Sequence, residues 1–185
     1  FLALLQPGPN VLAVRGLNVS ASDNDFLIQA ELEGRDDRPP TAANDVAIVF
    51  AEKLGGTEAK FVTKMNTKAK SLGMNATNFR NASGLPDKRQ ITTARDMAKL
   101  AEAVYADHKD RYNYFSLSSF TWKKRKYTNH NALLKKVAGV DGIKTGFTNA
   151  SGYNLMASAE RGGRRHIAII LRGPTGPSRA LHHSD

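Results

Sequence analysis

The chain has 185 residues, no cysteine, and a formal net charge of +10 at pH 7 with a sequence pI of about 9.9. Without cysteine it can form neither disulfide bonds nor thiolate metal sites, and it suits an oxidising compartment without requiring one. The length allows one domain with a sizeable core. The sequence contains no run of ~18 apolar residues of the kind that spans a bilayer.

Charge divides the chain near residue 40. Residues 1–40 carry three basic and six acidic side chains, whereas residues 41–185 carry 24 basic and 11 acidic ones. The chain also begins with Phe1 and has no charged segment ahead of an apolar stretch, so we expect a fragment without an export signal. The two parts do not share one composition, and we treat 1–40 as a separate segment.

Apolar residues at helical spacing predict a helix from Asn44 to Leu54, which Gly55 and Gly56 end. Thr57 is expected to cap a second helix. The inner face of that helix is predicted to carry Val62, Met65, Ala69 and Leu72.

Residues 73–91 are rich in Asn, Gly and Pro, which predicts an irregular loop. A third helix is expected after Thr93, where Asp96 completes a variant of the capping box. Its apolar stripe is predicted to be core and consists of Met97, Leu100, Ala101, Val104 and Tyr105.

From Phe115 onward the pattern becomes that of β-strands. One strand is predicted at 116–122, and a second contains Tyr127; they flank the basic turn 123–126, which we expect to be solvated. Three more strands are predicted at 140–147, 153–159 and 165–171, joined by short connections rich in Gly, Asn and Ser. The predicted class is α/β (α+β), with an antiparallel sheet packed against helices and an irregular tail at 172–185.

Six ordered blocks make residues 41–171 resemble the D-alanyl-D-alanine carboxypeptidases, the low-molecular-weight penicillin-binding proteins that trim the peptide stems of the bacterial cell wall. The blocks lie at 43–47, 70–74, 81–87, 92–98, 129–131 and 140–155. The last contains Lys144-Thr145-Gly146, one of the sequence elements of penicillin-binding proteins and serine β-lactamases. An exposed strand end with a solvated lysine is the alternative interpretation of this triplet alone.

The resemblance implies a penicillin-binding protein/β-lactamase-like fold whose N-terminal part is missing. It implies serine-type hydrolysis of the terminal D-Ala-D-Ala bond through an acyl-serine intermediate, with no metal or cofactor. The implied partners are the pentapeptide of peptidoglycan and β-lactams, in the periplasm or cell envelope. The resemblance also allows a peripheral association of the intact protein with the membrane.

Two family elements are incomplete. No Ser-x-x-Lys occurs in the 185 residues, so neither the nucleophile nor the general-base lysine is found. Thr57 and Lys60 have the same spacing, but they are expected to begin a helix. Where the family has Ser-x-Asn, the chain reads Ala42-Ala43-Asn44, without the hydroxyl. We therefore expect an inactive chain, and we interpret 1–40 as a frame-shifted, diverged or recombined segment.

The resemblance assigns roles to five residues. Asn44 would hydrogen-bond the substrate backbone and hold the catalytic lysine, and Lys144 and Thr145 would receive the substrate carboxylate. Gly146 leaves room for the substrate backbone. His130, where many relatives have arginine, would make this attraction depend on pH. Asn44 as a plain helix cap and His130 as a half-buried loop residue are the structural alternatives.

Two other classes of protein remain open. The net charge and the basic turn are compatible with a non-catalytic protein that binds a polyanion, a nucleic acid or the cell wall. No known nucleic-acid-binding motif is present, so nucleic acid is not expected as a partner. A relative of the serine β-lactamases shares Lys-Thr-Gly, but the chain offers no candidate for a deacylating glutamate.

Overall fold

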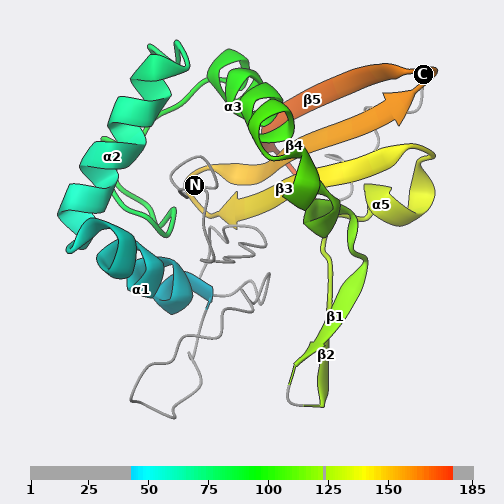
Figure 1. The fold of residues 1–185 in the computed structure, drawn as a ribbon, viewed down its shortest axis with the longest axis horizontal. Helices are drawn as coiled ribbons and strands as arrows, with labels where there is room; N and C mark the ends of the chain where they lie inside the picture. The colour runs from blue at the N-terminus through cyan, green and yellow to red at the C-terminus, as the bar shows by residue number, and fades with distance from the viewer. Residues whose placement is uncertain (1–42, 123, 177–185) are drawn as a thin grey trace.

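A computed structural model describes residues 43–122 and 124–176, so the predicted segment 1–40 and most of the predicted tail lie outside the described residues. The helices are α1 (Ala43–Gly55), α2 (Glu58–Ser71), α3 (Ala94–Asp107), the single turns α4 (Lys109–Tyr112) and α5 (Leu133–Lys136), and the 3-10 helix η2 (Asn113–Ser116). The strands are β1 (Ser119–Trp122), β2 (Arg125–Thr128), β3 (Val140–Thr148), β4 (Gly152–Arg161) and β5 (Arg164–Gly173) (Figure 1).

The predicted helix starts are confirmed by their caps. The Thr57 hydroxyl accepts a hydrogen bond from the backbone N–H of Lys60 at 3.2 Å, and the Thr93 hydroxyl accepts one from Asp96 at 3.2 Å. Each hydroxyl satisfies an N–H that has no partner within its helix. The sequence Thr57 to Lys60 therefore begins a helix, as expected.

The core side of α2 is close to the predicted one. Val62, Met65 and Ala69 are buried, but the most deeply buried side chain is Phe61, and Leu72 is the half-buried C-cap. Phe61 belongs to a cluster that includes Ala51 of α1. At Gly55 an added Cβ would lie 2.7 Å from the Cβ of Phe61, so glycine allows the close turn between α1 and α2.

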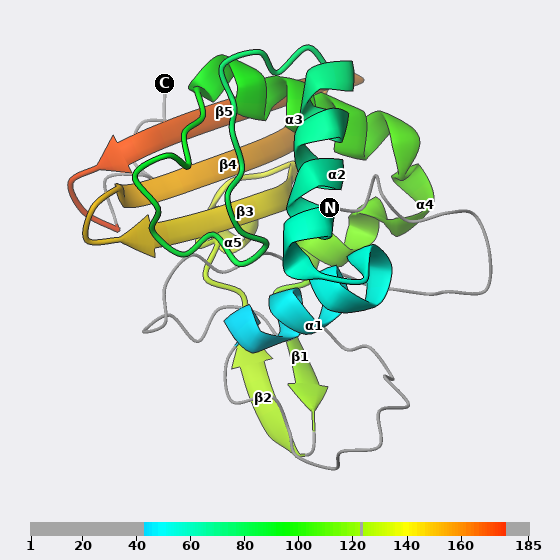
Figure 2. The ribbon, with the colours of Figure 1, turned by 90° about the vertical axis from the view of Figure 1, so that its left-hand side faces the viewer.

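Residues 73–91 form an irregular segment, as predicted, and side chains fix it to the helices. Asn66 of α2 binds both backbone groups of Phe79, at 2.8 and 2.9 Å. The buried carboxylate of Asp96 on α3 accepts hydrogen bonds from Ala76 N and Thr77 Oγ1. In Figure 2 this segment crosses in front of the sheet between α2 and α3.

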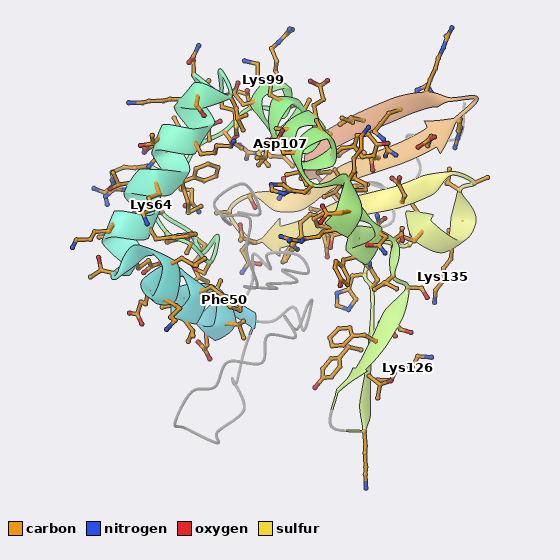
Figure 3. All side chains as sticks on the ribbon, in the orientation of Figure 1. Phe50, Lys64, Lys99, Asp107, Lys126 and Lys135 are labelled. Carbon is orange, nitrogen blue, oxygen red and sulfur yellow. The ribbon has the colours of Figure 1, made fainter. Side chains whose placement is uncertain are left out.

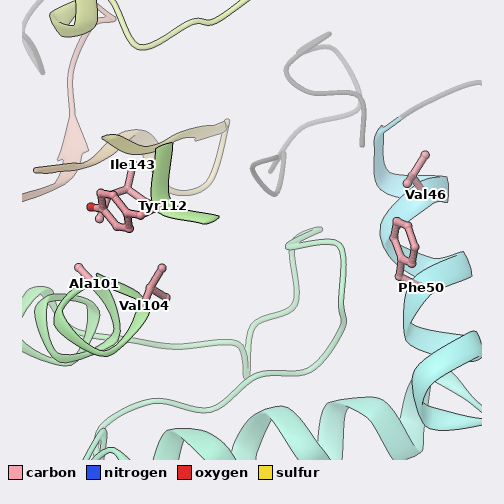
Figure 4. Close-up of a cluster of buried hydrophobic side chains, with 6 residues drawn as sticks. All are labelled: Val46, Phe50, Ala101, Val104, Tyr112 and Ile143. Carbon is pink, nitrogen blue, oxygen red and sulfur yellow. The ribbon is translucent and has the colours of Figure 1, made fainter. Parts of the chain in front are cut away.

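The main sheet of the described region has the order β3-β4-β5 and is antiparallel throughout. Successive residues of β4 face opposite sides of the sheet. Met156 packs against the cluster that contains Ala101 and Val104 of α3, whereas Leu155 and Ala157 pack with Leu133 of α5. Figure 4 shows the buried members of the first cluster, Val46 and Phe50 of α1, Ala101 and Val104 of α3, Tyr112 of α4 and Ile143 of β3.

The predicted sheet strands are confirmed and are one or two residues longer at most ends; β5 runs to Gly173, so the predicted tail begins too early. The strand predicted from residue 116 is wrong over 116–118. Ser116 lies in η2, where its hydroxyl donates to the Asn113 carbonyl at 2.7 Å and closes a turn. The predicted α+β class, a helix-covered antiparallel sheet, is confirmed. Within the described residues, every helix is too short or too polar to cross a membrane.

We expect Phe61→Ala to lower the free energy of unfolding by about 3–5 kcal/mol, because it leaves a cavity between α1 and α2. Phe61 is 0% exposed, whereas Ile91 is 57% exposed. Ile91→Ala is the matched control and should change stability by less than about 0.5 kcal/mol. Urea unfolding followed by circular dichroism measures both, and similar effects of the two substitutions would contradict this packing.

Candidate functional site

The Lys144-Thr145-Gly146 segment lies within β3, as the sequence predicts. Lys144 pairs with Met156, Thr145 with Leu155 and Gly146 with Asn154 of β4. The side chain of Lys144 is partly exposed, and its ammonium donates to the carbonyl of Thr145. Thr145 is only 2% exposed. The expected alternation of faces is therefore present, and the lysine is the more accessible of the two groups.

Asn131 holds the start of β3 from one side. Its side-chain amide donates to the carbonyl of Gly142 at 3.0 Å, and its amide oxygen accepts from the N–H of Leu133 at 3.2 Å. Asn131 is 4% exposed, so these bonds have little competition from water. Gly142 stands two residues before Lys144, and Asn131 thereby fixes where the lysine lies.

Asn129 fixes the same segment to the β1–β2 hairpin. Its side chain accepts from Asn131 N at 2.9 Å and donates to the Leu117 carbonyl at 3.0 Å. His130 lies between the two asparagines and is exposed, so its interpretation as a half-buried loop residue is wrong. From the sequence, 129–131 was a matching block with a binding role for His130 alone. The repeated asparagine in a short connection was the available signal for the structural role of the segment.

A polar network holds the start of β3 from the other side. Ser158 Oγ donates to Asp141 at 2.5 Å and must therefore accept the hydrogen bond that joins it to the Tyr112 hydroxyl, at 2.6 Å. Arg165 binds both oxygens of the Asp141 carboxylate, at 3.0 and 2.8 Å. The guanidinium also lies 3.6 Å from the ring centroid of Tyr105. No local sequence pattern contains this network, because its members lie on α3, α4, β3, β4 and β5.

Burial raises the pKa of Tyr112 to about 12, and the negative charge of Asp141 acts in the same direction. In this network the Tyr112 phenol donates to the Ser158 hydroxyl, and the hydroxyl donates to the Asp141 carboxylate. The Arg165 guanidinium balances the charge of that carboxylate. Its position beside Gly142 makes the start of β3 a rigid support for Lys144.

The other predicted site residues are distributed over two elements. Asn44 lies in the first turn of α1, and its side chain is outside the described part of the structure. Thr145 and Gly146 follow Lys144 on β3, and His130 is tied to the same strand through Asn131. The described residues therefore place Lys144 and Thr145 on β3, and His130 next to the asparagine that holds the start of that strand.

Comparison with known families matches residues 41–175 to the family described as D-alanyl-D-alanine carboxypeptidase. The chain is 38% identical over 136 residues to the D-alanyl-D-alanine carboxypeptidase DacA of Haemophilus influenzae, covering 72% of this chain and 35% of that protein. It is 39% identical over 135 residues to DacC of Escherichia coli, covering 72% and 34%. The chain thus spans about a third of the length of these curated relatives.

Solved structures give the same result. Penicillin-binding protein 5 from Haemophilus influenzae superposes with a TM-score of 0.71 at 38% identity, over 75% of this chain and 41% of that one. Penicillin-binding protein D2 from Listeria monocytogenes, in its cefotaxime-bound form, gives a TM-score of 0.68 at 37% identity, over 74% and 56%. The predicted resemblance and the penicillin-binding protein fold are confirmed, and the chain covers part of that fold.

We expect Tyr112 to ionise near pH 12 instead of the ordinary value of 10.0. Because the folded pKa is raised, the neutral phenol stabilises the fold fully below about pH 10, and this contribution is lost as the pH rises through about 12. Absorbance at 295 nm should show a late tyrosine step that Tyr112→Phe removes. Tyr114→Phe is the control and should leave that step in place; its loss in the control would contradict the assignment.

Proposed function

Because the chain belongs to the D-alanyl-D-alanine carboxypeptidase family, we propose that its β3 region is the carboxylate-binding part of such a site and that these 185 residues bind a D-Ala-D-Ala terminus without hydrolysing it. The observation that supports the proposal is the partly exposed Lys144 on a strand whose start is held by Asn131 on one side and Ser158 and Arg165 on the other.

In the proposed complex the ammonium of Lys144 donates to the terminal carboxylate of the peptide. A charge-assisted hydrogen bond is short and strong, and the fixed strand spares the cost of ordering the lysine backbone. Thr145 is a secondary donor, because its side chain is 2% exposed. Gly146 leaves space for the substrate backbone, and His130 adds positive charge when it is protonated. Asn44 contributes a contact to the substrate backbone.

Hydrolysis would require a nucleophile and a base that activates it. The 185 residues contain no Ser-x-x-Lys, and Thr57 serves as a helix cap. The two Listeria monocytogenes penicillin-binding protein D2 structures contain cefotaxime and ampicillin. For this chain we propose at most non-covalent binding of such compounds, since acylation needs the missing serine.

The family assignment also supports a proposal about organisation. Residues 41–171 form a partial catalytic domain of a cell-envelope enzyme, whereas 1–40 derive from a shifted reading frame or from divergence. The gene's nucleotide sequence tests this origin. An alternative frame that encodes Ser-x-x-Lys upstream of Asn44 would support the shifted frame, and its absence would exclude it.

We expect the purified chain to release no D-alanine from a D-Ala-D-Ala peptide. Binding groups alone fall orders of magnitude short of a complete serine hydrolase. A coupled assay for free D-alanine measures the release. Turnover that a covalent serine reagent abolishes would refute the proposal and would require another nucleophile.

We expect the chain to bind a D-Ala-D-Ala peptide weakly, with an affinity that falls as salt rises. Lys144→Ala should weaken binding by roughly 10- to 150-fold, corresponding to about 1.5–3 kcal/mol for a hydrogen bond to a charged group. NMR titration measures the dissociation constants. Lys124→Asn, in the turn of the β1–β2 hairpin, is the control and should change the affinity by less than about twofold. Equal losses would show diffuse charge attraction and would favour a polyanion-binding protein.

A further inference from the structure

The β1–β2 hairpin projects from the body of the molecule and carries a basic tip (Figure 1). Trp122 pairs with Arg125, so the connection consists of the two residues with the sequence Lys123-Lys124. Lys124 and Lys126 are exposed, and Figure 3 shows Lys126 on this hairpin, away from the sheet. The prediction of a solvated basic turn is confirmed for these two side chains.

The charged residues in and around the hairpin are all basic over a stretch of thirty residues of sequence. Residues 111–140 contain seven lysines and arginines and no aspartate or glutamate. Arg111, at the start of this stretch, pairs with Asp110 of α4 at 3.3 Å. The other ion pairs between described residues lie on α2 and α3, on the 80–89 loop and on the main sheet. The hairpin therefore presents a positive field that the described part of the chain does not neutralise.

The backbone at the tip of the hairpin places a lysine in a conformation that glycine and asparagine adopt more readily. Lys124 has a φ of 66°, in the left-handed region where glycine and asparagine are preferred in two-residue hairpins. The exposed Lys124 side chain places a positive charge in the connection between β1 and β2.

Aromatic residues accompany the cations. Phe120 and Tyr127 are cross-strand partners whose rings stack at 5.2 Å with an interplanar angle of 17°. The sequence places the only tryptophan of the chain, Trp122, at the end of β1. Lysine and arginine clusters attract anionic lipid headgroups, and tryptophan and tyrosine favour the interface between water and hydrocarbon.

We propose that the β1–β2 hairpin docks the protein on the surface of an anionic phospholipid bilayer. A projecting basic hairpin can meet a flat bilayer surface with its tip. A protein that binds single-stranded nucleic acid instead uses a basic groove with exposed aromatic rings on which the bases stack. Phe120 and Tyr127 stack on each other instead of standing apart as such platforms. The inference goes beyond the proposed carboxylate site and does not depend on it, because none of the residues of that site belongs to the hairpin.

The test uses the full chain and sonicated vesicles of phosphatidylcholine with 30% phosphatidylglycerol, at roughly 0.1 M salt, where charge is screened beyond about 10 Å. Trp122 is the only tryptophan, so its emission reports on the hairpin alone. We expect a blue shift with anionic vesicles, none with pure phosphatidylcholine, and quenching by brominated lipid. The same binding should appear in cosedimentation.

A charge-matched pair of variants locates the contact. Lys124→Asn with Lys126→Gln relaxes the turn and should weaken the partition into anionic vesicles by about 30-fold, the effect expected for two lysines at the surface. Lys60→Gln with Lys70→Gln removes two exposed lysines from α2 and should weaken it by less than about threefold. Lys144→Ala should leave vesicle binding intact, which separates this proposal from the carboxylate site.

Three results would overturn the proposal. Equal losses from the two double variants would show attraction by net charge alone. An unchanged Trp122 emission with anionic vesicles would show that the hairpin does not meet the bilayer. Tighter binding to a single-stranded oligonucleotide than to anionic vesicles, abolished by the hairpin variant, would assign the hairpin to nucleic acid instead.

Discussion

The pairing of Arg165 with Asp141 is the interaction on which the arrangement of the main sheet depends. The guanidinium of Arg165 on β5 binds Asp141 near the start of β3. It also binds Glu160 of β4 at 2.9 Å and stacks on Tyr105 of α3. Arginine suits this position, because its planar group can satisfy a carboxylate at its edge and an aromatic ring at its face. Removing Arg165 would leave the partly buried Asp141 carboxylate without its charged partner, which costs more than the pair contributes.

This pairing also explains how a short sheet supports a site. A strand at the edge of the described sheet would be the easiest part of it to distort. β3 is instead fixed at Asp141 by Ser158 and Arg165 and at Gly142 by Asn131. Lys144 follows two residues after Gly142 on the same strand. The position of its side chain, which would meet an anion, is therefore fixed by contacts from Asn131, Ser158 and Arg165.

The local features of the fold were predictable from the sequence. Helical periodicity, the caps at Thr57 and Thr93 and the glycine-rich hairpin connections depend on neighbouring residues, and each is found as predicted. The roles of Tyr112, Asp141 and Arg165 depend on residues more than twenty positions apart, and no local pattern contains that information. The start of β1 was misplaced for a related reason, since a serine-closed turn competes with the strand there.

For the site, sequence resemblance supplied the residues and the structure supplied their accessibility. The Lys-Thr-Gly segment lies on a strand with alternating faces, but the burial of Thr145 and the exposure of His130 follow from packing that the motif does not encode. The comparison proteins are about three times longer than the matched region. The proposed site of this chain accordingly rests on β3 and the residues that hold it, and the contribution of Asn44 stays a prediction.

The segment 73–91 shows where the chain can and cannot change in length. Its backbone has little regular structure, yet Asn66 satisfies both backbone groups of Phe79, and the Gln90 side chain accepts from Arg80 N and Asn81 N. An inserted residue would move these groups out of register with side chains anchored on α2. In contrast, a Cβ added at Gly162 or Gly163, between β4 and β5, would meet nothing within 4 Å. The open β4–β5 turn is therefore a better place for a longer chain than 73–91, where an insertion would break the hydrogen bonds that fix the segment.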